Sequence, residues 1–105
     1  MPESGDHLRL DAGKRRIDLM PTEWVLGLAD ILTFGAEKYE DRGWEAGMDW
    51  GRVFGPLQRH SWAFWGGESI DPDSGLHHLL HAGWNALALY SYDLRNLGTD
   101  NRPQP

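Results

Sequence analysis

The residues best suited to chemistry begin with a short acidic segment that follows two consecutive glycines. Glu68, Asp71 and Asp73 lie close together in the stretch ESIDPDSG, directly after Gly66-Gly67. Carboxylates at this density suit hard divalent cations such as Mg²⁺ or Mn²⁺. Asp-Pro-Asp-Ser is also ordinary turn and helix-capping chemistry. The segment is therefore a candidate metal site with a purely structural alternative.

Histidines form a second group of chemically capable residues. His78, His81 and Asn85 are spaced i, i+3 and i+7, which places them on one stripe of a helix. Polar groups on such a stripe are costly to bury unless they have partners. His60 lies on the preceding helical segment. We therefore interpret His60, His78 and His81 as candidate metal ligands or general bases; alternatively, they satisfy one another or reach across a dimer interface.

Cations and one further carboxylate complete the candidate set. A lysine offers phosphate a flexible point charge, and an arginine offers a bidentate fork. Each of these cations taken singly is typical of a solvated surface. The candidates for phosphate binding are Lys14, Arg16, Lys38 and Arg59. Glu37, near the end of an earlier helical segment, could add a metal ligand from another element.

Three helical segments must position these side chains. Apolar residues recur at helical spacing over residues 22–39 and again over about 74–96. A helix between them ends at Trp65 and begins either at 49–51, with Pro56 inside it, or near Gly55, with Pro56 in its first turn. We expect an all-α fold: a single domain over 1–105 with about three main helices, an extended basic arm over 1–20 and a flexible tail over 97–105. Trp44 and Trp50, in the loop over 40–50, are expected to pack back on this domain.

Composition excludes several functional classes. The chain has no cysteine, which rules out disulfides, thiolate zinc sites and cysteine nucleophiles, and fits a reducing compartment. No apolar run is long enough to span a membrane, and no signal peptide is evident, so we expect a cytoplasmic protein. With 16 acidic against 10 basic residues, binding to duplex nucleic acid is not expected. Glycine-loop phosphate motifs and the G-x-S-x-G elbow are absent.

Seven short motifs occur in an order that resembles a known family. The chain is similar to the phage-encoded dATP/dGTP diphosphohydrolase N-terminal domain, related to the MazG-like and MazZ-like nucleotide pyrophosphohydrolases, from about residue 8 to 92. The motifs are Asp11-x-Gly13-Lys14-x-Arg16, Leu19-x-Pro21, Phe34-Gly35-Ala36-x-Lys38-Tyr39, Trp44-x-x-Gly47, Arg59-His60, Gly67-Glu68-x-x-Asp71-x-Asp73-Ser74-Gly75 and His78-x-x-His81-Ala82-x-x-Asn85.

This resemblance implies a hydrolase that uses Mg²⁺ or Mn²⁺ to convert a purine deoxynucleoside triphosphate to the monophosphate and pyrophosphate. It also implies a phage product that acts inside an infected bacterium and a helical domain that forms a homo-oligomer. The broader group carries a helical E-E-x-x-E motif followed by E-x-x-D. This sequence has Glu68-x-x-Asp71 but only Glu37-x-x-Glu40 as a fragment of the first motif, so histidines would replace the missing carboxylates.

For the activity that this resemblance implies, we assign a role to each candidate site residue. The metal ligands are Glu68, Asp71, Asp73 and Glu37, and one of the three histidines serves as a ligand or as the base. Trp44 and Asn85 contact the nucleotide. Two alternatives stay open: a histidine-aspartate-type metal phosphohydrolase that acts on nucleotides, and a non-enzymatic helical phage protein that binds a nucleotide or a host partner.

Overall fold

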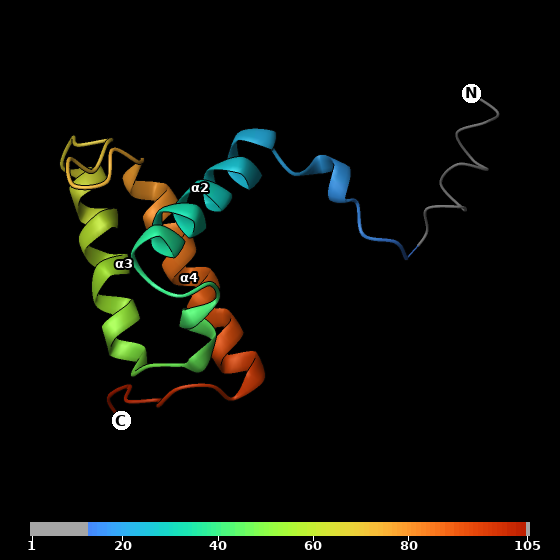
Figure 1. Cartoon of the computed structure of the whole chain (residues 1–105), viewed down its shortest axis with the longest axis vertical. Helices are drawn as coiled ribbons and strands as arrows, with labels where there is room; N and C mark the ends of the chain where they lie inside the picture. The colour runs from blue at the N-terminus through green and yellow to red at the C-terminus, as the bar shows by residue number, and fades with distance from the viewer. Residues whose placement is uncertain (1–12, 105) are drawn as a thin grey trace.

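The computed structural model describes residues 13–104 and confirms the all-α prediction (Figure 1). Three helices make up the body: α2 (Thr22–Lys38), α3 (Trp50–Trp65) and α4 (His78–Arg95). Two short 3₁₀ turns, η1 (Ile17–Leu19) and η2 (Gly43–Ala46), precede α2 and α3. Within the described residues the β structure is limited to two isolated bridges. None of the described helices is both long enough and apolar enough to cross a membrane.

The helices α3 and α4 form an antiparallel pair joined by the loop over 66–77 (Figure 1). Of the two starts predicted for α3, the structure has the earlier one, because the helix begins at Trp50 and contains Pro56. The proline has no N–H to give the preceding turn, and the helix continues in spite of this loss. The third helix starts at His78, later than predicted, with His77 as its N-cap, whose Nδ1 accepts a hydrogen bond from the Leu79 N–H at 3.0 Å.

The apolar core lies at the end of this pair farthest from the 66–77 loop. Val53, Ala88 and Tyr92 are at most 2% exposed there. Trp44 and Trp50 pack against them, as the sequence predicts, and the Tyr92 hydroxyl donates a hydrogen bond to the carbonyl of Trp44 at 2.5 Å. A buried tyrosine needs such a partner for its hydroxyl, so this contact fixes η2 to α4.

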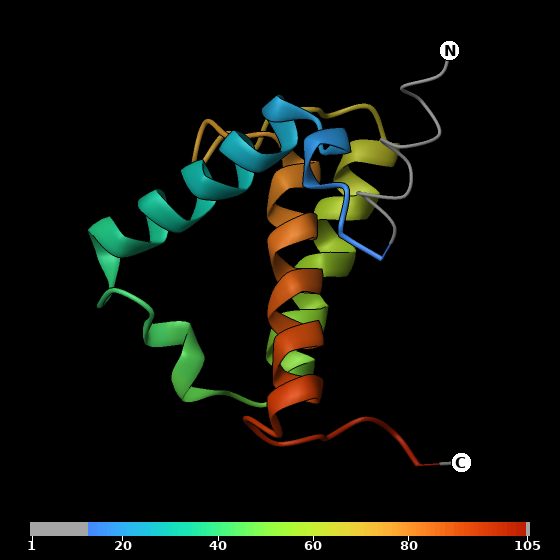
Figure 2. The same ribbon diagram turned by 90° about the vertical axis from the view of Figure 1, so that its right-hand side faces the viewer.

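Helix α2 crosses α4 at two glycines. A Cβ on Gly27 would stand 2.5 Å from Cδ2 of Leu80, and a Cβ on Gly83 would collide with the indole of Trp24. The absent side chains let the two helices approach closely over a short contact. Beyond that contact α2 diverges from the α3–α4 pair, as the second view shows (Figure 2). The chain then returns through η2 to the start of α3.

The segment after α4, which the sequence predicts as a flexible tail, makes specific contacts as far as Arg102. The Trp50 indole N–H donates to the Leu97 carbonyl at 2.9 Å, and the Gly51 N–H donates to Oδ1 of Asn101 at 2.8 Å. Gly98 has φ +71°, and a Cβ there would collide with the Met48 carbonyl oxygen. Only glycine therefore allows the tail to approach the loop before α3 this closely.

Candidate metal centre and groove

The loop over 66–77 is folded around the carboxylate of Asp71. This carboxylate accepts hydrogen bonds from the Asp73 N–H at 3.0 Å and from the Ser74 hydroxyl at 3.3 Å. The loop is closed by backbone hydrogen bonds from Asp71 to Leu76 and from His78 to Ser69. Asp71 is 9% exposed. The turn chemistry seen in the sequence thus fixes a buried carboxylate in place.

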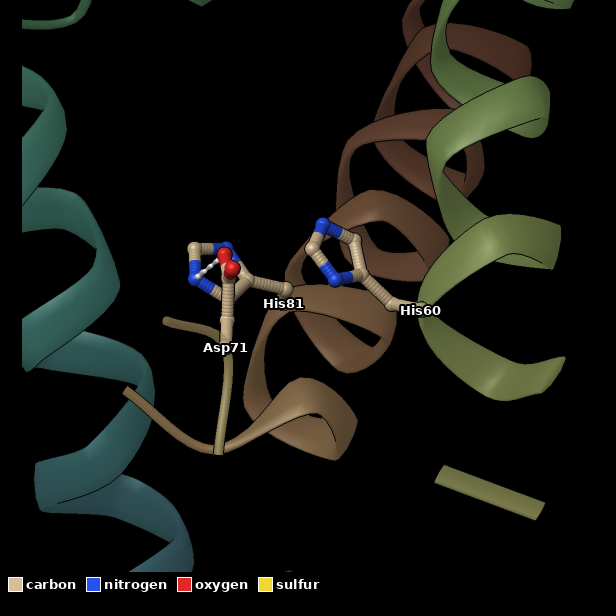
Figure 3. Close-up of side chains that lie close together, drawn as sticks. All are labelled: His60, Asp71 and His81. Atoms are coloured by element: carbon tan, nitrogen blue, oxygen red, sulfur yellow. Dashed lines mark ion pairs between the residues drawn. The ribbon is translucent and has the colours of Figure 1, made fainter. Parts of the chain in front are cut away.

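Two histidines from different helices lie beside this carboxylate. His60 comes from α3, His81 from α4 and Asp71 from the loop, and one potential ligand atom of each lies within 4.8 Å of the others (Figure 3). We call these three residues the His–Asp cluster. The rings of His60 and His81 stack with centroids 4.5 Å apart, and His81 Nε2 lies 3.5 Å from Asp71 Oδ2. Two imidazoles and a carboxylate are a recognised donor set for a divalent metal.

A chain of hydrogen bonds leads from the cluster to the loop surface. His60 Nδ1 lies 2.8 Å from His78 Nδ1, and His78 Nε2 lies 2.7 Å from Oε1 of Glu68. His78 is 5% exposed, whereas the Glu68 side chain is 55% exposed. Both nitrogens of the buried imidazole are therefore engaged, one by a carboxylate and one by a histidine of the cluster.

The protonation of the cluster follows from its surroundings. Burial lowers the pKa of His60, and the neighbouring His81 and His78 lower this pKa further. Burial also lowers the pKa of His81, although Asp71 opposes that effect. Burial acts to raise the pKa of Asp71, but the hydrogen bonds from Asp73 and Ser74 outweigh it and leave this pKa below its usual value. At neutral pH the cluster thus holds two neutral imidazoles and one carboxylate.

A groove of about 1190 Å³ lies between α2 with its following loop and the α3–α4 pair, and the two histidines of the cluster line it, whereas Asp71 does not. His60 and His81 lie in its wall together with Lys38, Trp44 and Asn85. Lys38 lies with Nζ 4.6 Å from the centre of the Phe34 ring, and the edge of that ring faces His81. The structure therefore brings five predicted site residues to one groove.

The other predicted site residues do not share this groove. Glu68 reaches the cluster only through His78, and Asp73 supplies a backbone N–H but is itself exposed. Asp71 and His78 are buried and do not line the groove. Four further predicted residues are exposed and are not part of the groove wall: Glu37, Lys14, Arg16 and Arg59. The segment that carries Lys14 and Arg16 extends away from the three helices (Figure 1). Asp11, in the first motif, lies outside the described residues.

Two residues at the site were missed from the sequence. The Ser74 hydroxyl lies 2.7 Å from His81 Nε2 and also contacts Asp71, so it holds the two ligand candidates side by side. Trp84 lines the groove, and its indole N–H is buried without a hydrogen-bond partner among the described residues. The Asp-Pro-Asp-Ser turn could have indicated Ser74, whereas no local pattern indicates an unpartnered indole.

Comparison with known proteins agrees with the order of the motifs. Residues 4–102 match the family described as dATP/dGTP diphosphohydrolase, N-terminal. A protein of Salmonella phage PMBT28 named dATP/dGTP diphosphohydrolase is 25% identical over 83 residues, which is 79% of this chain and 28% of that protein. The chain thus spans just over a quarter of that relative's length. No solved structure matches the chain. Because the family match covers almost every residue, the chain belongs to the dATP/dGTP diphosphohydrolase N-terminal family.

Proposed function

We propose that this protein is a metal-dependent nucleotide pyrophosphohydrolase that converts a purine deoxynucleoside triphosphate to the monophosphate and pyrophosphate. The observation that carries the proposal is that His60 and His81, two members of the His–Asp cluster, line the groove, which combines metal-ligand chemistry with room for a nucleotide. Family membership and the name of the phage relative support the same substrate class.

We assign different residues of the groove to different parts of the nucleotide. Three cations line the groove: Lys38, Arg42 and Arg95. Lys38 is the one that stands within a family motif, and we assign it to the phosphates. Trp44 offers an aromatic surface to the base. Asn85 lines the groove, and its amide forms no hydrogen bond to another described residue, so we assign it to the nucleotide.

A divalent ion, when bound, would supply Lewis acidity to the phosphoryl oxygens and lower the pKa of a water molecule. The donor set of the cluster fits such an ion, because His60 and His81 are neutral and Asp71 is ionised at neutral pH. The remaining work of the chain is to position the phosphates, to hold the ligand side chains and to exclude bulk water from the groove. Of the acids predicted to bind the metal, Asp71 is the one that we retain as a direct ligand.

A second candidate is a histidine-aspartate-type phosphohydrolase that acts on the same nucleotides. The donor set favours it, because the cluster contains two histidines and an aspartate. It differs from the first candidate in the bond that breaks, and it would release triphosphate or phosphate.

Self-association is part of the proposal. Large apolar side chains are exposed on two helices: Val25 at 49% and Leu26 at 59% on α2, and Trp62 at 65% and Trp65 at 78% on α3. Surfaces of this kind mark interfaces in many proteins. We assign them to a homo-oligomer, and we place the protein in the cytoplasm of the infected bacterium, in keeping with the phage origin of the relative.

Product analysis tests the proposal. The purified chain is incubated with each deoxynucleoside triphosphate and with Mg²⁺ or Mn²⁺, and the products are separated by ion-exchange chromatography. We expect monophosphate and pyrophosphate from a purine nucleotide, with turnover lost on chelation and reduced at least about 100-fold in Asp71→Asn. Asp73→Ala is the matched control, because its side chain lies outside the cluster. Triphosphate or phosphate as product selects the second candidate, and no turnover with any nucleotide overturns both.

A further inference from the structure

The donor set of the His–Asp cluster differs from the one that the acidic sequence motif predicts. The acidic motif favours a site of carboxylates, which suits Mg²⁺ or Mn²⁺ because both ions accept oxygen ligands. In the structure two of the three converging side chains are imidazoles, from His60 and His81, and only Asp71 brings oxygen. Imidazole nitrogen is a better ligand for first-row transition metals than for Mg²⁺.

The hydrogen bonds of His78 determine which nitrogen of His60 is available. At 2.7 Å from the Glu68 carboxylate, an acceptor only, His78 Nε2 must carry a proton. When His78 carries its single proton on Nε2, its Nδ1 is an acceptor, and the 2.8 Å contact then has His60 Nδ1 as the donor. A neutral His60 with its proton on Nδ1 has its lone pair on Nε2. In this arrangement of protons, the exposed glutamate sets the tautomer of a histidine two hydrogen bonds away.

The free nitrogen of His60 has no competing partner. The hydrogen bond of His60 to another side chain among the described residues uses Nδ1, which leaves Nε2 for a ligand. Metal-binding histidines commonly use their second nitrogen to hydrogen-bond a carboxylate or another acceptor, which fixes the ring and raises its basicity. Here the acceptor is His78, and Glu68 completes the chain.

The other two side chains of the cluster are held by the loop. Ser74 contacts both His81 and Asp71, and the Leu76 N–H donates to its hydroxyl at 3.1 Å. The three potential ligand atoms lie within 4.8 Å of one another. A bound ion at about 2.0–2.2 Å from each of them would require these atoms to lie somewhat closer together. Small rotations of the two imidazoles supply that difference, because their backbones are already fixed by α3 and α4.

We infer that His60, Asp71 and His81 bind one transition-metal ion of the Mn²⁺, Fe²⁺, Co²⁺ or Zn²⁺ class in preference to Mg²⁺, and that Glu68 and His78 are positioning residues for His60. The inference rests on the proposed function, since it names the ion that this function requires. It also gives Glu68 a different role from the direct ligand that the sequence predicts.

Metal titration without nucleotide tests the inference. Chelator-treated protein is titrated with Co²⁺, followed by its visible absorption, and with Mn²⁺, Zn²⁺ and Mg²⁺ by calorimetry. We expect one transition-metal ion per chain, bound at least about tenfold more tightly than Mg²⁺. The Co²⁺ absorption should disappear in His60→Gln, His81→Gln and Asp71→Asn. Circular dichroism of each variant confirms that the helices are intact.

The positioning role has its own pair of variants. Glu68→Ala should weaken Co²⁺ binding about 10- to 100-fold, whereas Asp73→Ala, a neighbouring exposed acid of the same loop, should leave it unchanged. Long-range ¹H–¹⁵N spectra of the metal-free protein should show His60 with its proton on Nδ1 in the wild type and a loss of that preference in Glu68→Ala. A merely structural role for Glu68 would not alter the tautomer.

The outcomes separate this inference from the proposed function. Co²⁺ binding that depends on both histidines, without turnover of any nucleotide, supports the inference and contradicts the function. Turnover with Mg²⁺ that survives His60→Gln and His81→Gln, together with equal affinity for Mg²⁺ and Co²⁺, overturns the inference and leaves the function standing. Equal Co²⁺ affinities in Glu68→Ala and Asp73→Ala overturn the positioning role.

Discussion

The two ends of the α3–α4 pair are built from opposite kinds of side chain. At one end Val53, Ala88 and Tyr92 form a dry apolar cluster. At the other end the same two helices bury His78 and partly bury His60 and His81 beside Asp71. Burial of apolar side chains stabilises the fold directly, at about 25 cal/mol per Å² removed from water. Burial of an imidazole or a carboxylate costs free energy that its hydrogen bonds only offset.

This difference shows what each end contributes. The apolar end is closed by Trp44 of η2 and by Leu97 of the tail, and it holds the helices together. The polar end, where α2 crosses α4 before it diverges from the pair, borders the groove (Figure 2). A protein selected for stability alone would fill that end with leucines. The histidines at this end therefore support the metal site that we propose.

The largest effect on stability is expected at the apolar end. Tyr92→Ala removes a fully buried ring and the hydrogen bond that anchors η2, and should cost about 3–5 kcal/mol of unfolding free energy. Urea denaturation followed by circular dichroism measures the change. Tyr90→Ala, on the same helix but 69% exposed, is the matched control and should cost far less. Similar losses in both variants would contradict the assignment of this end as the core.

The helices themselves could be predicted well from the sequence. Apolar periodicity and flanking glycine and proline located α2 within a residue of its observed end, because these signals act locally. The start of α4 was misplaced because Ser74 looks like a helix cap. Its hydroxyl is instead committed to His81 and Asp71. A contact between side chains on different elements can override a capping pattern, and the local sequence does not reveal it.

The site could be predicted as a set of residue types but not as a geometry. The motif contains three carboxylates, from Glu68, Asp71 and Asp73, that are equally suitable as metal ligands. Of these, only Asp71 is part of the cluster. The direction of each carboxylate depends on the turn that the loop adopts. The groove depends on how α2 crosses α4, which is set by the close approach at Gly27 and Gly83. Tertiary contacts of this kind leave no periodic signal.

A smaller effect on stability is expected at the polar end. His81→Gln should change the unfolding free energy by less than about 1.5 kcal/mol, because the glutamine replaces part of the hydrogen bonding to Ser74. The same variant should lower nucleotide turnover at least about 100-fold. Denaturation and product analysis on one preparation give both numbers. His77→Asn, which keeps a capping side chain outside the cluster, is the control. A loss of stability as large as that of Tyr92→Ala would make the polar end a structural core.

The smallest effect concerns the tail that covers the apolar end. Hydrogen bonds from the Arg102 side chain and backbone lower the pKa of Asp100 to about 2, and they hold the guanidinium 4.8 Å from the Trp50 ring. The pKa of Asp100 in the folded protein is lower than its unfolded value of about 3.9. The Asp100–Arg102 pair therefore contributes its full stabilisation above a pH of about 3.9. This stabilisation is lost as the pH falls through about 2, and it should be small because both side chains are exposed to screening by salt. Carboxyl-detected NMR titration measures this pKa directly, with Arg102→Gln as the variant that should return it toward 3.9. An Asp100 pKa near 4 in the wild type would mean that the pair does not form in solution, and that Leu97 and the tryptophans hold the apolar end without help from the Asp100–Arg102 pair.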